Sequence, residues 1–379
     1  MNSRITFGMV IGLCLCGSSA YTQASAANDK QLRDLVSRAN AGDADAQFNL
    51  GVIYHNGEGV PEDFKKAVEW YTKAAEQGDA DAQSILAGMY QNGDGVPEDL
   101  KKAAEWYAKA AEQGDAEAQS NLGLMYVDGE GVPQDYKKAC EWFEKAAQQG
   151  DAMAQSYLGV LYDEGNGVPQ NHSKAFEWFK KAAEQGLAKA QLIVGQQYYS
   201  GKGVPQDFKM AIEWLAKAAE QGLAKAQYDL GVMYDEGKGV VAQDYSKAFE
   251  WYAKAAEQGN ADAQHNLGVM YHEGVGVPRD YRKALEWYTK AAQQGLAYAQ
   301  RDIAYMYLEG EGVSQDFAKA HMWANLAASQ GGDSAERAQK IREAVAARMT
   351  PAQIAEAQKL ASEIVPTPSK RRITLVEPG

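Results

Sequence analysis

The chain has few cysteines, no excess of positive charge and no long hydrophobic run beyond its first residues. Its 379 residues include 3 cysteines, and 51 acidic residues outnumber 38 basic ones, for a formal net charge of -13. A field of that sign repels phosphate backbones and anionic lipid surfaces, so we expect no nucleic-acid partner. No later stretch is apolar enough to span a bilayer, which predicts a mature chain without a transmembrane segment.

The first 26 residues have the layout of a secretory signal peptide. Arg4 precedes an apolar run over residues 5–16, and small residues follow as far as Ala26. The run is too short for a permanent anchor, and Leu13 and Leu15 stand before the two cysteines, where a lipoprotein would need a small residue. We therefore expect residues 1–26 to be removed after Ala26, and the mature protein to be bacterial and periplasmic or secreted.

The rest of the sequence repeats itself with a period of 36 residues. The tryptophans mark the period, because seven steps of 36 residues, one of them lengthened to 37, separate Trp70, Trp106, Trp142, Trp178, Trp214, Trp251, Trp287 and Trp323. The longer step contains "GKGVVAQDY", where Val241 and Ala242 replace the single proline of the other copies. Self-similarity at a fixed period predicts stacked repeats and not ordinary globular domains.

Each copy predicts two helices joined by a turn. From Asp63 onward, apolar residues fall on one arc of a helix and charged residues on the other. Asp63 can cap the start of this helix, and Gly78 can end it in a left-handed conformation. In the preceding segment Leu50 and Tyr54 share a stripe, and we expect Gly51 beside them to let another backbone approach closely.

A single helix pair cannot bury its own apolar face, so the copies must stack on one another. We predict an all-α fold, a right-handed α/α superhelical solenoid of eight helix–turn–helix repeats over residues 43–330. The tryptophans are expected to form rungs of its core, each burying on the order of 200 Å².

The two ends of the array predict caps. Residues 27–42 predict an N-terminal capping helix, and residues 331–365 predict C-terminal capping helices. The last of these should begin with Thr350 as its N-cap and Pro351 at its first helical position. Residues 366–379, which include the basic run "KRR", predict a flexible, solvated tail.

The repeated pattern is A-Q-x-x-L-G-x-x-Y-x-x-G-x-G-V-P-x-D-x-x-K-A-x-x-W-Y-x-K-A-A-x-Q-G. The third copy follows it from Ala118 to Gly150, with Phe143 where the pattern has Tyr. This pattern resembles the Sel-like repeat (SLR), a relative of the tetratricopeptide repeat, and the resemblance covers nearly all of residues 43–330. It implies an α/α solenoid that serves as a protein-binding scaffold in bacterial envelopes, signalling or host interaction.

Cys140 is the only cysteine beyond the expected signal peptide, which excludes an internal disulfide framework. It stands where other copies have Val, Ala, Phe, Ile or Leu. This position predicts a small buried hydrophobic side chain. A reactive thiol is the alternative.

Signatures of catalysis are missing. No Ser-x-x-Lys or G-x-S-x-G occurs, and "HEGVG" at His272 lacks the second histidine of a zinc protease. His265 and His272 lie seven residues apart on one predicted helix, hence about 10 Å along its axis, too far to share a metal without a partner helix. We expect no catalytic residue, no cofactor and no metal site.

One exported branch of the family is cysteine-rich and described as β-lactamase or penicillin-binding. The resemblance therefore carries an alternative function, a β-lactamase-like hydrolase or a binder of β-lactams or peptidoglycan fragments. This chain lacks the paired cysteines of that branch.

Variable positions on the first helices predict a binding surface. In tetratricopeptide relatives the first helices line the concave face, and the resemblance transfers that role to the matching positions here. In repeats five to eight these positions combine aromatic, amide and charged side chains, which suit a peptide or protein partner. The candidate binding residues are Leu192, Gln196, Tyr199, Tyr228, Asp235, Glu236, His265, His272, Arg301 and Tyr305.

The sequence thus predicts an exported, non-catalytic scaffold or adaptor that binds a protein or peptide through the concave face of its repeats. A secreted factor that engages host proteins is a further alternative. Sequence drift on a solvated groove would produce the same variability without any binding role. The sequence does not indicate an oligomeric state.

Overall fold

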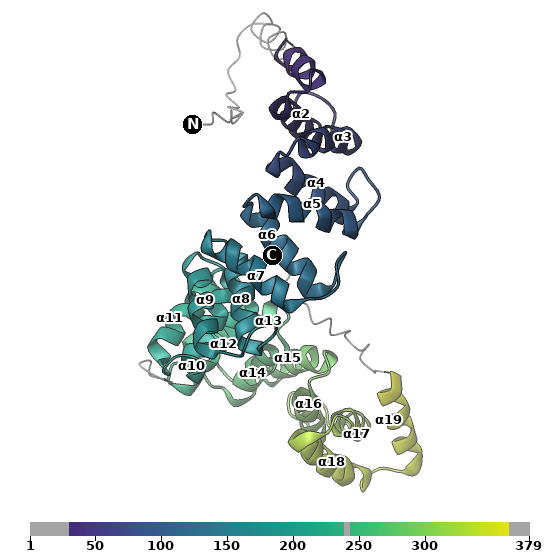
Figure 1. The fold of residues 1–379 in the computed structure, drawn as a ribbon. Coiled ribbons are helices and arrows are strands. Elements are labelled where there is room, and N and C mark those ends of the chain that lie inside the picture. The colour runs from purple at the N-terminus through teal and green to yellow at the C-terminus, as the bar shows by residue number, and fades with distance from the viewer. Residues whose placement is uncertain (1–29, 239–242, 364–379) are drawn as a thin grey trace, which may run out of the picture. The chain divides into compact units, whose positions relative to one another are not determined.

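The computed structural model describes residues 30–238 and 243–363, and every regular element in these ranges is a helix (Figure 1). The expected signal peptide, the lengthened loop at Val241 and Ala242, and the expected tail over residues 366–379 lie outside the described residues. Within the described ranges, no helix combines the length and the hydropathy needed to cross a membrane.

The chain divides into two compact units, Met1–Gln170 and Asn171–Gly379. In the first unit a helix over residues 30–40 precedes α2 (Ala44–Asn56), α3 (Phe64–Glu76), α4 (Ala80–Asn92), α5 (Leu100–Glu112), α6 (Ala116–Asp128), α7 (Tyr136–Gln148) and α8 (Ala152–Glu164). The second unit contains α9 (His172–Glu184), α10 (Ala188–Ser200), α11 (Phe208–Glu220), α12 (Ala224–Glu236), α13 (Tyr245–Glu257), α14 (Ala261–Glu273), α15 (Tyr281–Gln293), α16 (Ala297–Glu309), α17 (Phe317–Ala328), α18 (Gly332–Ala346) and α19 (Pro351–Glu363).

Within each unit, helices that follow one another along the chain pack side by side (Figure 1). In the first unit α2 packs on α3, α3 on α4, and so on to α8; the second unit continues the same order from α9 to α17. Within each unit, the first helix of a repeat therefore lies between second helices that precede and follow it along the chain. The predicted all-α architecture of stacked helix pairs is confirmed.

Helix boundaries follow the predicted capping chemistry. The Asp63 side chain accepts a hydrogen bond from the backbone N–H of Lys66, and Gly78, just past the end of α3, has a φ of 97°. Thr350 and Gln353 form a reciprocal capping box at the start of α19: Thr350 N donates to Gln353 Oε1 (2.8 Å), and Gln353 N donates to Thr350 Oγ1 (3.4 Å). The helices α18 and α19 both pack on α17, at the C-terminal end of the array.

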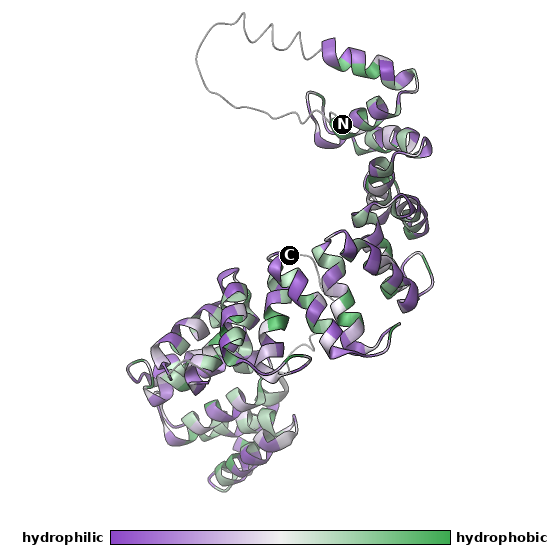
Figure 2. Ribbon diagram, turned by 60° about the vertical axis from the view of Figure 1, so that its left-hand side comes forward, coloured by the Kyte–Doolittle hydropathy of each residue, from purple (hydrophilic) through white to green (hydrophobic). Residues whose placement is uncertain are grey.

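Where an aromatic residue follows the tryptophan, that residue is the deeper of the two. Tyr71, Phe143 and Tyr252 are almost completely buried, whereas among the tryptophans only Trp214 and Trp323 are buried. The other tryptophan rings are half-buried, with a lysine three residues further on over each ring, as where Lys73 Nζ lies 3.7 Å from the ring centroid of Trp70. The tryptophans therefore belong to the core as expected, but most of them lie at its edge: partly buried rings that pack against core clusters are Trp70, Trp106, Trp142, Trp251 and Trp287. Figure 2 shows the hydrophobic and hydrophilic residues alternating around the helices.

In repeats one, three, six and seven a glycine of the first helix makes room for this aromatic ring. A Cβ on Gly51 would lie 2.6 Å from Tyr71 Cδ1, and one on Gly123 would lie 2.6 Å from Phe143 Cε1. The expectation that the glycine admits a neighbouring backbone is thus wrong for these two copies, since a side chain of the same repeat fills the space. In repeat eight, where Ala304 replaces the glycine, the residue after the tryptophan is the small Ala324.

Buried glutamines connect consecutive repeats. Gln83 Nε2 donates to the carbonyl of Ala75 in the preceding repeat (2.9 Å), and Gln113 Nε2 donates to Gln83 Oε1 (2.8 Å). Gln264 and Gln294 make the same pair of bonds in the second unit. A buried amide without such partners would cost free energy, so these bonds fix one repeat on the next.

Candidate functional site

The second unit presents the candidate binding residues on four first helices. They lie on α10 (Leu192, Gln196, Tyr199), α12 (Tyr228, Asp235, Glu236), α14 (His265, His272) and α16 (Arg301, Tyr305). Leu192 is half-buried and packs against the hydrophobic core formed by α11 and α12. Glu236 and Tyr305 are exposed, the tyrosine by 45%.

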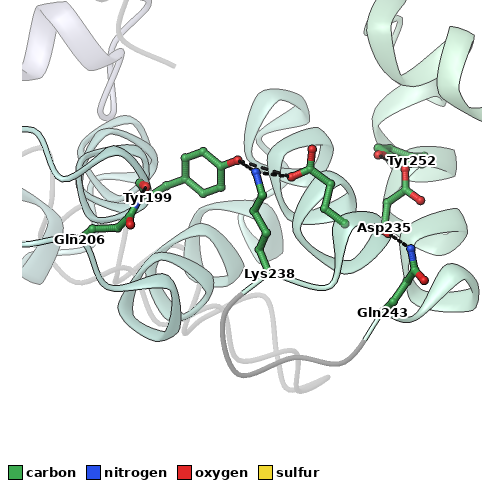
Figure 3. A network of polar contacts seen from close by, with 7 residues as sticks. Tyr199, Gln206, Asp235, Lys238, Gln243 and Tyr252 are labelled. Atoms are coloured by element: carbon green, nitrogen blue, oxygen red, sulfur yellow. Dashed lines mark hydrogen bonds and ion pairs between the residues drawn. The ribbon is translucent and has the colours of Figure 1, made fainter.

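Polar contacts join α10 to α12. Gln196 Nε2 donates to Asp229 Oδ2 over 2.7 Å. Further along, Lys238 Nζ donates to the Tyr199 hydroxyl (2.8 Å) and pairs with Glu236 Oε2 (2.8 Å), as Figure 3 shows. The hydrogen bonds that Lys238 donates to Glu236 and to the Tyr199 hydroxyl raise the pKa of Lys238, so this side chain is charged at neutral pH.

A second group of side chains on α12 and α13 is held by burial. The Tyr252 hydroxyl donates to Asp235 Oδ2 over 3.2 Å, and Figure 3 draws the two residues together. Burial raises the pKa of Asp235, an effect that the bond from Tyr252 opposes. Burial, followed by the charge of Asp262, raises the pKa of Tyr228 to about 12, so its hydroxyl is neutral at physiological pH.

The structure brings four candidate residues together around one cavity. His265, His272, Arg301 and Tyr305 line a pocket of about 250 Å³ between α14, α15 and α16, and Val269, Glu273, Tyr288 and Asp302 complete its lining. The pocket mixes aromatic, aliphatic and charged groups.

Carboxylates of repeat eight orient both histidines of this pocket. His265 Nε2 lies 2.8 Å from Asp302 Oδ2, whose other oxygen is 2.6 Å from Arg301 Nη2. His272 Nε2 lies 2.7 Å from Glu311 Oε2. Asp302 is therefore shared between a cation and an imidazole, and each histidine ring is tied to the following repeat.

Within residues 30–238 and 243–363, no three His, Cys, Asp or Glu side chains are grouped so that they could hold a metal ion.

Cys140 is 3% exposed, and its Sγ lies 3.7 Å from the carbonyl oxygen of Asn166. Burial, followed by the charges of Glu144 and Glu141, raises the pKa of the Cys140 thiol to about 11. The predicted small buried side chain is confirmed.

Several residues of this surface escaped the sequence analysis. Asp229 and Asp302 occupy the position just before the repeat leucine or isoleucine, where the first three copies have Asn49, Ile85 and Asn121, so their acidity was a usable signal. Tyr288 follows the repeat tryptophan, at a position that the pattern assigns to the core, so it was not among the candidate binding residues. Lys238 and Glu311 lie in the turns after the first helices, outside the helix positions that the resemblance indicated.

Comparison with known proteins identifies the repeats of this chain. Eight segments match the family model described as Sel1 repeat, over residues 44–79, 80–115, 116–151, 152–187, 188–223, 224–260, 261–296 and 297–332. A Sel1 repeat protein from Oxalobacter formigenes is 37% identical over 82% of this chain and 89% of its own, with a TM-score of 0.64. A protective antigen present in uropathogenic Escherichia coli strains, which displays an SLR fold, is 32% identical over 87% of this chain and 86% of its own, with a TM-score of 0.49. No curated protein matches the chain.

Proposed function

Because the chain belongs to the Sel1 repeat family, whose members generally mediate protein–protein interaction, we propose that it is an exported, non-catalytic scaffold. It binds a protein or peptide partner through the face formed by α10, α12, α14 and α16. We call this the first-helix face, and its binding residues are the ten named above. The N-terminal residues 1–26 direct export and are removed, which leaves a periplasmic or secreted protein that begins at Ala27.

The contacts between successive first helices carry this proposal. Gln196 reaches Asp229 on the next first helix, and His265 reaches Asp302 in the same way. These two contacts join candidate residues to neighbouring first helices, α10 to α12 and α14 to α16, so polar side chains of separate repeats meet on a packed scaffold. A surface of that kind, with a half-buried arginine and an exposed tyrosine, offers the residue types that commonly anchor protein partners.

A matched pull-down tests the binding face. Mature protein, from Ala27, is immobilised and exposed to the envelope fraction of the source bacterium. It is compared with Arg301→Ala/Tyr305→Ala on the first-helix face and with Tyr245→Ala/Arg282→Ala on the second helices. Both double variants remove one tyrosine and one arginine, and Tyr245 and Arg282 are exposed like Tyr305.

The proposal expects a partner that the mature protein and the second-helix variant retain and the first-helix variant loses, while all three have the same helical circular dichroism. Equal capture by the two variants would place the binding site elsewhere. Export is tested separately, by mass spectrometry of the mature N-terminus, which should be Ala27. A full-length chain that keeps Met1 in the cytoplasm would contradict it.

A further inference from the structure

Tyr288 belongs to the wall of the pocket between α14, α15 and α16. The residue as a whole is 3% exposed, so its ring is packed in the core and what remains accessible faces the cavity. In the part of the chain that the structure describes, its hydroxyl forms no hydrogen bond. The hydroxyl is therefore free to bond a group that enters the pocket.

The equivalent tyrosines of repeats two and six have internal partners. The Tyr107 hydroxyl donates to Gln91 Oε1 over 3.1 Å, and the Tyr252 hydroxyl donates to Asp235 Oδ2 (Figure 3). In repeat seven the matching partner position is His272, whose Nε2 pairs with Glu311 instead. Repeat seven therefore lacks the internal hydrogen bond that repeats two and six have at this position.

The surroundings of this hydroxyl are acidic. Asp302 and Glu273 line the same pocket as Tyr288. Burial, and after it the charges of these two carboxylates, raise the pKa of Tyr288, so its hydroxyl is neutral at physiological pH. A neutral phenol oxygen can still accept a hydrogen bond from a cationic donor.

The free charge at the pocket is negative. Arg301 is neutralised by its contact with Asp302, and Asp302 also holds His265. Glu273 is exposed, and its carboxylate has no ion pair among the described residues. Glu273 is the last residue of α14, and the C-terminal end of a helix dipole is also negative. The carboxylate therefore does not stabilise the helix, and together with the dipole it attracts a cation.

We propose that this pocket binds the side chain of a lysine or arginine from the partner of the first-helix face. The cationic head lies between the Glu273 carboxylate and the Tyr288 hydroxyl, and the methylene stem packs along Val269 and the exposed ring of Tyr305. At about 250 Å³ the cavity is below the usual range for small-molecule sites, and it suits one inserted side chain. The inference rests on the proposed function and assigns the chemistry of its partner.

Synthetic peptides provide the test. Acetyl-GSKSG-amide, acetyl-GSRSG-amide, acetyl-GSQSG-amide and acetyl-GSESG-amide are titrated into the mature chain, with NMR signals of labelled histidine and tyrosine rings as the readout. The lysine and arginine peptides should shift the rings that line the pocket, and the glutamine and glutamate peptides should not. Raising the salt concentration should weaken the binding.

Three variants locate the interaction. Glu273→Gln should weaken binding of the lysine peptide about tenfold and Tyr288→Phe about fivefold, because each removes one polar contact to a cation. Glu286→Gln removes an exposed carboxylate from α15 of the same repeat without touching the pocket, and should change binding less than about twofold.

Equal binding of the glutamine peptide, no binding of any peptide, or equal effects of Glu273→Gln and Glu286→Gln would overturn the inference. If the matched pull-down still loses its partner with Arg301→Ala/Tyr305→Ala, only the pocket chemistry is wrong. If that pull-down shows no difference between the faces, the proposed function itself is wrong.

Discussion

Repeats two and three of the first unit and repeat seven of the second unit are built on the same scaffold. Gln83 and Gln264 each donate one hydrogen bond to the preceding repeat and accept one from a glutamine of their own repeat, and Gly123 and Gly268 both face the aromatic ring of their own second helix. The features that stack the helices are thus independent of position in the chain.

The first-helix faces of these repeats differ in chemistry. Repeat two has Ser84, Gln91 and Asn92 where repeat seven has His265, His272 and Glu273. Gln91 accepts the hydrogen bond of Tyr107, whereas His272 leaves Tyr288 open to a pocket. The comparison separates residues that build the array from residues that give one part of it a surface of its own.

The largest expected effect is a difference in unfolding free energy between a tryptophan variant of the second unit and one of the first. Trp214 is 5% exposed, whereas Trp142 is half-buried under Lys145. Trp214→Ala should lower the free energy of unfolding by about 3–5 kcal/mol, and Trp142→Ala by about half as much, because less buried surface is lost. Urea unfolding of the two variants measures this, and equal losses would show that burial does not rank the tryptophans.

Glycines of the first unit give the next largest difference. Gly123→Ala places a Cβ 2.6 Å from Phe143 Cε1 and should cost up to about 3 kcal/mol through overpacking. Gly88→Ala meets only the Tyr107 hydroxyl at 3.5 Å and should be neutral or stabilise by up to about 1 kcal/mol through helix propensity. Urea unfolding should separate the pair, and the same sign for both changes would contradict the packing described here.

The glutamine bridges should cost the same in both units. Gln119→Ala and Gln264→Ala should each lower the free energy of unfolding by about 2 kcal/mol, because each leaves a buried carbonyl without its donor and removes one of the two hydrogen bonds that the neighbouring glutamine donates. The two losses should agree within about 0.5 kcal/mol. A clear difference in urea unfolding would mean that the scaffold is not uniform.

The smallest effect concerns Cys140. At pH 7, Cys140→Val should change the free energy of unfolding by less than about 1 kcal/mol, because Val68 fills the same position in repeat one. Burial raises the thiol pKa from 9.0 to about 11, so the thiol contributes its stabilisation below pH 9 and loses it as the pH rises through 11. The wild type should therefore lose stability relative to the variant over that interval in urea unfolding, and parallel pH curves would be evidence against it.

Much of the fold could be predicted because its determinants are local and recur. The 36-residue period, the capping aspartates and the Thr350–Gln353 box all act within a few residues of sequence, and the structure confirms the helix pairs they predict. The exposure of the tryptophans could not be predicted from helical periodicity, because a lysine three residues further on lies over both the buried Trp214 and the half-buried Trp142, and nothing local distinguishes the two.

The candidate pocket was only partly predictable for a similar reason. The variable positions indicated His265, His272, Arg301 and Tyr305, which the structure groups around one cavity. Tyr288 also lines the cavity, and it was assigned to the core pattern; unlike Tyr107 and Tyr252, it does not bond the residue at the matching position of its first helix. That difference arises from contacts between repeats, such as His272 with Glu311, which are 39 positions apart in sequence.

The most direct test of the account exchanges one face while keeping the scaffold. The variant His265→Ser/His272→Gln/Glu273→Asn gives repeat seven the first-helix residues of repeat two, and the proteins it retains from an envelope fraction are quantified against those retained by the unchanged mature chain. We predict the same helical circular dichroism and a similar urea midpoint, with loss of the partner that the unchanged chain retains. Retention of the same partner by the exchanged chain would contradict the claim that repeat seven contributes a binding surface.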